Sequence, residues 1–275
     1  MASGSMEFLQ DGAWTKRMHP GWAAVAGFTA ATLARHGFKG PRATYEGRFG
    51  VFNSYLGPLA KDSDLGLATA GLGEVWELDK VTVKPLPACH FTHACADAAA
   101  ILRDRHSLRV ADIAAVRALV PAEVVKTVCE PVATKKRPQN SYDAQFSIPY
   151  TVATALAKGR FGLAELDDAA LRDEQVLALA AKVEYEVDPD SPFPTYYSGE
   201  VVVTLNDGRE LRHREHVNRG AAERPISNAD VERKFFENMQ LVTSTARATQ
   251  VRDLVLAIGR DSAAVDVQRG LAARG

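Results

Sequence analysis

The sequence predicts a predominantly helical α+β protein. Alanine-rich segments of helical length come first, valine-rich segments of strand length follow, and helical segments return at the end. If the last helices pack beside the first, the middle is an insertion. We therefore expect an all-α body with an inserted α+β lid domain: residues 1–80 as the remainder of the helical domain, 81–218 as the lid, and 219–275 as C-terminal helices returning to the helical domain.

The first helix is expected to run from Pro20 to Arg35. Proline suits the first position of a helix, and Gly37 follows as a terminator. The sequence then predicts a turn and short helix within residues 46–55 and an extended stretch over 76–83. Two further alanine-rich helices are expected over residues 91–103 and 110–119.

The middle of the chain changes character. Residues 123–132 are valine-rich and predict a strand, whereas Asp143 is a candidate N-cap of a helix ending at Gly159. Asn206-Asp207-Gly208 predicts the turn of an antiparallel hairpin with one solvent-facing side. Ser227 is expected to cap a C-terminal helix. Further helices are predicted over 176–181, 250–258 and 262–273, and further strands over 182–187, 200–205 and 209–217.

Composition excludes several classes of function. The chain has 275 residues, 46% of them hydrophobic, and a formal net charge of −1, so neither nucleic acid nor an anionic membrane is attracted by its overall charge. No apolar run approaches the roughly 20 residues that cross a bilayer, and the N-terminus lacks a signal pattern. Three cysteines cannot form a dense disulfide framework. We expect a cytoplasmic protein with no nucleic-acid or membrane partner.

Two segments place a lysine and a histidine just before an expected helix: Lys16 with His19, and Lys84 with His90. The free N–H groups and dipole of a helix N-terminus favour an anion, and an ammonium group reinforces this. A histidine there can transfer a proton near neutral pH. The pattern predicts a carboxylate site, with the alternative that the histidines only cap helices and the lysines are solvated.

Other candidate sites are weaker. Cys89, His90, His93 and Cys95 invite a zinc interpretation, but their spacing matches no four-ligand pattern, so no metal is predicted. Core packing accounts better for Cys95 and for Cys129. Tyrosines flanking an apolar helix usually fill the core, and a substrate-binding role for Tyr142 stays open. The basic loop 135–137 has no aromatic platform for nucleic acid.

Five motifs in the chain resemble successive signatures of the MmgE/PrpD family, and the resemblance covers essentially the whole chain. They are Thr-Lys-Arg-Met-His-Pro-Gly-Trp at 15–22, Glu-Gly-Arg-Phe-Gly at 46–50, Lys-Pro-Leu-Pro at 84–87 with Thr92-His93, Tyr-Asp-Ala-Gln-Phe-Ser-Ile-Pro-Tyr at 142–150, and the segment from Asn218-Arg219-Gly220 to Phe236-Glu237-Asn238.

The resemblance implies a helical domain with an inserted lid, usually in a homodimer, and chemistry on small polycarboxylates without metal or organic cofactor. The family includes 2-methylcitrate dehydratase, cis-aconitate decarboxylase and iminodisuccinate epimerase. Lys16 and Lys84 match lysines that the family places at its active site, and His19 lies beside the first. His90 lies next to the position of a functional histidine in some relatives, where this chain has Cys89.

Family members also carry a long N-terminal helical segment with active-site residues, which we expect this chain to lack. Three hypotheses about the chain follow from that expectation: it is the C-terminal portion of an enzyme, a subunit completed by a separately encoded N-terminal half, or a non-catalytic remnant. Each would expose apolar helix faces that call for a partner.

The functional hypothesis is a cofactor-independent dehydratase, a carbon–oxygen lyase, acting on a 2-methylcitrate-like polycarboxylate. His19, His90 and Lys84 are the predicted catalytic residues, and Lys16, Lys84 and Tyr142 are predicted to bind substrate. A decarboxylase or epimerase of a small polycarboxylate is the alternative, because family resemblance does not fix the reaction.

Overall fold

The computed structural model describes residues 4–8, 13–260 and 263–272, and it forms two compact units, residues 1–80 and 81–275. The described residues are mostly helical and include a small mixed sheet of four strands, all in the second unit. The predominantly helical α+β class is confirmed. The inserted lid and the return of residues 219–275 to the helical domain stay predictions. In the described part of the chain, no helix is both long and apolar enough to cross a membrane.

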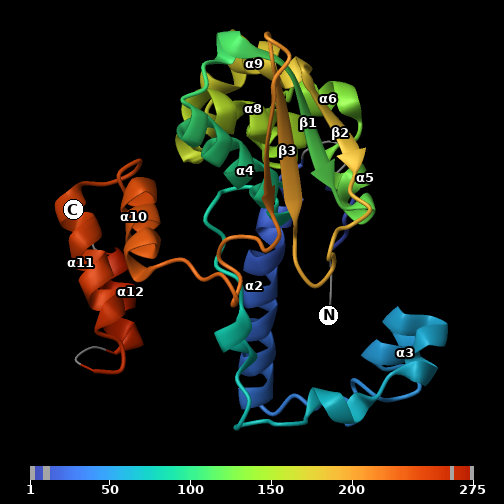
Figure 1. The fold of residues 1–275 in the computed structure, drawn as a ribbon. Helices are drawn as coiled ribbons and strands as arrows, with labels where there is room; N and C mark the ends of the chain where they lie inside the picture. The colour runs from blue at the N-terminus through green and yellow to red at the C-terminus, as the bar shows by residue number, and fades with distance from the viewer. Residues whose placement is uncertain (1–3, 9–12, 261–262, 273–275) are drawn as a thin grey trace. The chain divides into compact units, whose positions relative to one another are not determined.

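The first unit contains helix α2 (Thr15–Arg35) and the short helix α3 (Val51–Leu56) (Figure 1). The expected start of the first helix at Pro20 is wrong, because the N–H groups of Arg17 and Met18 already donate to the Trp14 carbonyl and close the first turn ahead of the proline. Pro20 therefore lies inside the helix, where it lacks a hydrogen-bond donor. The predicted short helix after residue 50 is confirmed. Three 3₁₀ turns complete the unit: Gly57–Asp62, Leu65–Ala68 and Glu77–Lys80, the last of which replaces the expected extended stretch.

The second unit is built on a sheet with the strand order β2-β1-β3-β4. Strand β1 pairs in parallel with β2 and antiparallel with β3, and β3 forms an antiparallel hairpin with β4. The predicted hairpin around Asn206-Asp207-Gly208 is confirmed. The strands are β1 (Ile113–Val120), β2 (Val183–Val187), β3 (Gly199–Leu205) and β4 (Glu210–Glu215).

The predicted helix over residues 110–119 is wrong, since this segment is strand β1. Val116 and Ala118 are fully buried, whereas Arg117 between them points to the opposite side of the sheet. There Arg117 forms ion pairs with Glu186 of β2 and Glu210 of β4. Alternation of core and solvent faces is the strand pattern, which the alanines of this segment obscured in the sequence.

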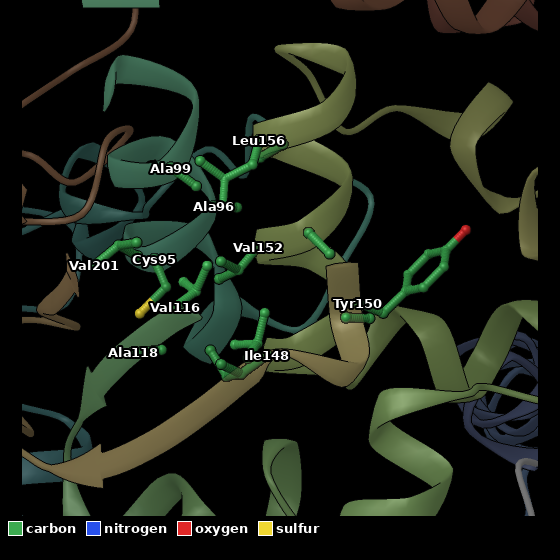
Figure 2. Packing of buried hydrophobic residues seen from close by; sticks show 14 of the residues in the cluster. Cys95, Ala96, Ala99, Val116, Ala118, Ile148, Tyr150, Val152, Leu156 and Val201 are labelled. Atoms are coloured by element: carbon green, nitrogen blue, oxygen red, sulfur yellow. The ribbon is translucent and has the colours of Figure 1, made fainter. Parts of the chain in front are cut away.

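Helices α4 (His90–His106) and α8 (Ile148–Lys158) pack against each other, and α4 also lies on strands β3 and β4. Figure 2 shows Ala96 and Ala99 of α4 facing Leu156 of α8. Small side chains let the two helices approach closely. Cys95 and Cys129 are both buried, which confirms that they pack in the core.

Residues 123–132 are helical rather than a strand, so that prediction is wrong. They form the 3₁₀ turn Ala122–Val124 and helix α5 (Val125–Val128). Val124 and Val128 are buried at helical spacing, which explains how a valine-rich segment buries its apolar side without joining the sheet.

The helix expected between Asp143 and Gly159 is two helices. Asn140 caps α7 (Ser141–Gln145), and Ser147 caps α8, which ends at Gly159 as predicted. Ser227 caps α10 as expected, with a reciprocal bond to Asp230. The remaining helices of the described residues in this unit are α6 (Val132–Lys136), α9 (Glu174–Ala181), α10 (Asn228–Met239), α11 (Thr245–Leu256) and α12 (Ala264–Ala272), with 3₁₀ turns at Val110–Asp112, Leu163–Leu166 and Ala170–Arg172.

Candidate anion-binding site at the start of helix α4

The segment that carries Lys84 is held against the loop after strand β4. The backbone N–H of Val83 donates to the Gly220 carbonyl at 3.1 Å. Gly220 has φ +94°, and a Cβ there would lie 2.1 Å from the Val83 oxygen. Only glycine fits both this conformation and this approach. Gly220 therefore fixes the position of Lys84, whose side chain is exposed to solvent.

The other end of the Lys84–His90 turn is held by helix α7. Gln145 donates from Nε2 to the Pro87 carbonyl at 2.7 Å, and its own carbonyl accepts the N–H of Cys89 at 2.8 Å. Cys89 is the N-cap residue of α4, so His90 is the first residue of that helix. The Asp-Ala-Gln-Phe motif thus positions the turn that joins Lys84 to His90.

Hydrogen bonding sets the protonation state of His90. Its Nε2 lies 2.9 Å from Nδ2 of Asn218, and Oδ1 of Asn218 accepts the backbone N–H of Tyr197 at 3.2 Å. Because the amide oxygen is occupied by a donor, the amide nitrogen must donate to His90. Nε2 of His90 is then an acceptor, and the ring carries its proton on Nδ1. Asn218 is only 2% exposed, so water does not compete for this bond.

Electrostatics also favour a neutral His90. Partial burial of the ring and, secondly, the charge of Lys84 lower the pKa of His90 to about 4. The imidazole is therefore uncharged at neutral pH. It can donate a hydrogen bond from Nδ1.

His93 lies one turn further along α4, directly beside His90. The two rings are 5.0 Å apart, and His93 is fully buried. Its Nε2 lies 3.3 Å from the Ala88 carbonyl, the same oxygen that Lys84 approaches at 3.5 Å. Burial, followed by the charge of His90, lowers the pKa of His93 to about 3. Within the described residues, Nδ1 of His93 has no hydrogen-bond partner.

Next to this turn, a hollow of about 220 Å³ opens between α4 and α10. Arg219 lines it and forms a two-point ion pair with Asp97 of α4, with distances of 2.8 and 3.1 Å. Consecutive residues, Asn218 and Arg219, therefore connect the loop after β4 to the start of α4. Sequence reasoning did not assign either residue to the site, although their motif was noted as one that resembles the family.

The structure brings Lys84 and His90 together at one turn. The other predicted site residue in this unit, Tyr142, is 4% exposed and stacks on Phe146, with ring centroids 4.8 Å apart. Lys16 and His19 lie in the first turns of α2 in the first unit, not upstream of the helix as predicted, and both approach the ring of Phe8. A site shared between the two units stays a prediction.

The described residues contain no cluster of three or more histidine, cysteine or acidic side chains that could hold a metal ion. The cationic and neutral donors at the α4 turn suit a carboxylate better than a cation.

The fold and this turn together define an α+β domain in which an exposed lysine lies beside a neutral histidine at the start of a helix. Residues 86–259 match the MmgE/PrpD C-terminal domain, and residues 1–62 match the MmgE/PrpD N-terminal domain. The chain belongs to the MmgE/PrpD family. The expectation that it lacks the N-terminal segment is wrong, because residues 1–62 are themselves recognised as N-terminal domain sequence.

Several curated relatives are cis-aconitate decarboxylases. The human protein of that name is 31% identical over 241 residues, which cover 84% of this chain and 47% of the relative. The mouse protein is 30% identical, covering 82% and 45%. That of Aspergillus terreus (strain NIH 2624 / FGSC A1156) is 26% identical over 266 residues, covering 91% and 53%. The chain spans about half the length of the curated relatives it matches.

Proposed function

We propose that this chain carries the Lys84–His90 part of a carboxy-lyase site that acts on a cis-aconitate-like polycarboxylate without a cofactor. The observation that carries the proposal is the turn at the start of α4, where an exposed ammonium and a neutral imidazole meet. The relatives named cis-aconitate decarboxylases support this chemistry over others in the family.

In the proposed mechanism, Lys84 binds a carboxylate that is retained in the product. The substrate charge then offsets the Lys84 charge that lowers the pKa of His90. His90 becomes able to take up a proton as the substrate binds. The pKa of His90 is thus lowered by Lys84 in the free protein and raised by the substrate carboxylate when it binds.

Decarboxylation breaks the bond between a carbon and its carboxylate group. Carbon dioxide leaves without that electron pair, which stays on the substrate skeleton. A proton must then be added to a carbon. The Nδ1–H of His90 supplies it from the imidazolium form, in which the second proton lies on Nε2 and displaces the Asn218 amide. Proton exchange with solvent then returns the ring to the Nδ1–H form that Asn218 stabilises. Atoms and charge balance without any further reactant, since His90 takes up one proton at Nε2 on binding and gives one from Nδ1 to the carbon.

The dehydratase hypothesis has less support than this alternative. Loss of water from a 2-methylcitrate-like substrate would need the same carboxylate binding, but the relatives found carry the decarboxylase name. Epimerisation rests on family resemblance alone. Proton NMR of the protein mixed separately with cis-aconitate, 2-methylcitrate and iminodisuccinate distinguishes the three reactions by which substrate disappears.

A Lys84→Ala variant tests the assigned role of the lysine. A hydrogen bond to a charged group contributes about 1.5–3 kcal/mol, so kcat/KM for cis-aconitate should fall by about 10- to 150-fold. Lys158→Ala is a matched control, because Lys158 at the end of α8 pairs with Asp173, the N-cap residue of α9, and is not part of the turn. Unchanged turnover in Lys84→Ala would remove Lys84 from the site.

A partner surface is the second part of the proposal. Helix α2 has no buried residue among those described, and large apolar side chains such as Trp22 and Phe28 are 53% and 79% exposed. Such faces favour association, for example in a homodimer. Light scattering of the purified protein, alone and at several concentrations, measures whether it self-associates.

A further inference from the structure

We propose that Lys234 of helix α10 is a second carboxylate-binding residue at the Lys84 turn, so that two ammonium groups together hold one polycarboxylate. This inference rests on the proposed function for its substrate class. It adds a residue from a helix that lies 150 positions further along the chain.

The first observation is a direct contact between the two lysine segments. Nζ of Lys234 donates a hydrogen bond to the backbone carbonyl of Lys84. The ammonium of Lys234 is therefore held at the same turn whose backbone Gly220 also contacts. Lys234 is half-buried, whereas Lys84 is exposed, so one ammonium lies at the base of the turn and the other can reach solvent.

The second observation is that neither lysine has a carboxylate partner among the described residues. The other cations around the hollow between α4 and α10 are paired. Arg219 pairs with Asp97, Arg160 with Glu165 and Arg233 with Asp230. Lys234 is thus the one cation lining this hollow without a carboxylate partner among the described residues, and the neighbouring Lys84 has none either, so the two ammonium groups mark a place where an anion can bind.

Electrostatics agree with this geometry. Partial burial and then the charge of Lys84 lower the pKa of Lys234. Both effects disfavour the ammonium form of Lys234 in the free protein. A bound carboxylate would counter the repulsion between the two lysines, so its binding energy includes the relief of that repulsion.

Space for a small polyanion lies beside Lys234. Lys234 lines the hollow of about 220 Å³ and an adjoining hollow of about 270 Å³. Pro85, the neighbour of Lys84, also lines both hollows. The ligand class is therefore a compact molecule with at least two carboxylates. A monocarboxylate would engage only one ammonium.

The test is calorimetric binding of tricarballylate, a saturated tricarboxylate that lacks the double bond of cis-aconitate. The variants are Lys234→Gln, which keeps a donor for the Lys84 carbonyl but removes the charge, and Lys234→Arg, which keeps the charge. Lys158→Gln is the control, because its ion pair with Asp173 lies outside the turn. Acetate serves as the monocarboxylate ligand.

We expect Lys234→Gln to weaken tricarballylate binding by about 10-fold or more, Lys234→Arg to restore most of it, and the control to change nothing. Acetate binding should change much less. Equal affinity of the wild type and Lys234→Gln, equal losses for Gln and Arg, or no binding of tricarballylate to the wild type would each overturn the inference.

The outcome is separable from that of the proposed function. Charge-dependent tricarballylate binding without turnover of cis-aconitate supports the second lysine and contradicts the carboxy-lyase proposal. Turnover of cis-aconitate that depends on Lys84 but not on Lys234 supports the carboxy-lyase proposal and contradicts the role of the second lysine.

Discussion

Replacing Asn218 by aspartate should reverse the protonation preference of His90 with almost no change in shape. In the wild type, the Asn218 amide donates to Nε2 of His90, while its oxygen accepts the N–H of Tyr197. Aspartate keeps the acceptor for Tyr197 but offers His90 a negative charge instead of a donor. His90 must then protonate at Nε2 to make the contact.

The magnitude follows from the pKa of about 4 in the wild type. An opposite charge within about 4–6 Å raises the pKa of such a group by about 1–3 units, which brings His90 to about 5–7. At pH 6, the protonated fraction of His90 should rise from about 1% to between about 10% and 90%. The effect is large because Asn218 is only 2% exposed, so solvent screens the new charge weakly.

The assay is an NMR titration of the histidine Cε1–H signals. The chain has seven histidines, and a His90→Gln variant assigns the relevant signal. Asn206→Asp is the matched control, because Asn206 bonds the Ala111 carbonyl at the hairpin turn and should leave His90 unchanged. A titration midpoint of His90 that is the same in Asn218→Asp and wild type would refute the hydrogen-bond assignment and, with it, the neutral tautomer on which the mechanism depends.

Two further predictions concern the elements that support the turn. Gly220→Ala should reduce kcat/KM by more than 10-fold, because its Cβ would overlap the Val83 carbonyl and displace Lys84; wild-type kinetics would show that the turn tolerates this shift. The lowered pKa of His93, about 3, means that the unfolded state binds its proton first as pH falls below about 6.5. Stability should therefore fall between about pH 6.5 and 3, by up to about 1.4 kcal/mol per pH unit from this group. The free energy of unfolding, measured with urea at several pH values, should depend less steeply on pH in His93→Gln than in the wild type. An identical dependence would contradict the lowered pKa of His93.

Local signals predicted the elements whose ends are marked by capping residues. As expected, helix α10 begins after Ser227 and helix α8 ends at Gly159. Capping depends only on backbone groups within a few residues, so the sequence could predict it. The hairpin at Asn206-Asp207-Gly208 was likewise predictable, because a tight turn and alternating polarity are local features. These parts of the fold required no knowledge of distant contacts.

Strand β1 was not predictable in the same way. Its alanines suit a helix in isolation, and what makes it a strand is pairing with β2 and β3, whose residues come more than 60 positions later. Such pairing overrides local preference because it provides backbone partners for both edges of β1 at once. The valine-rich residues 123–132 are the opposite case: they suit a strand in isolation, but they pair with no strand and bury Val124 and Val128 from helical turns instead.

For the candidate site, the sequence by itself determined the kinds of group present: Lys84 and His90 beside the start of an alanine-rich helix, in motifs of one family. Only the tertiary structure decided that Asn218, 128 positions from His90, donates to its ring, and that Lys234 reaches the Lys84 carbonyl. The physical reason is that charge and hydrogen-bond direction depend on neighbours in space. Those neighbours are brought together by the packing of α4 against β4 and by the loop that leads to α10.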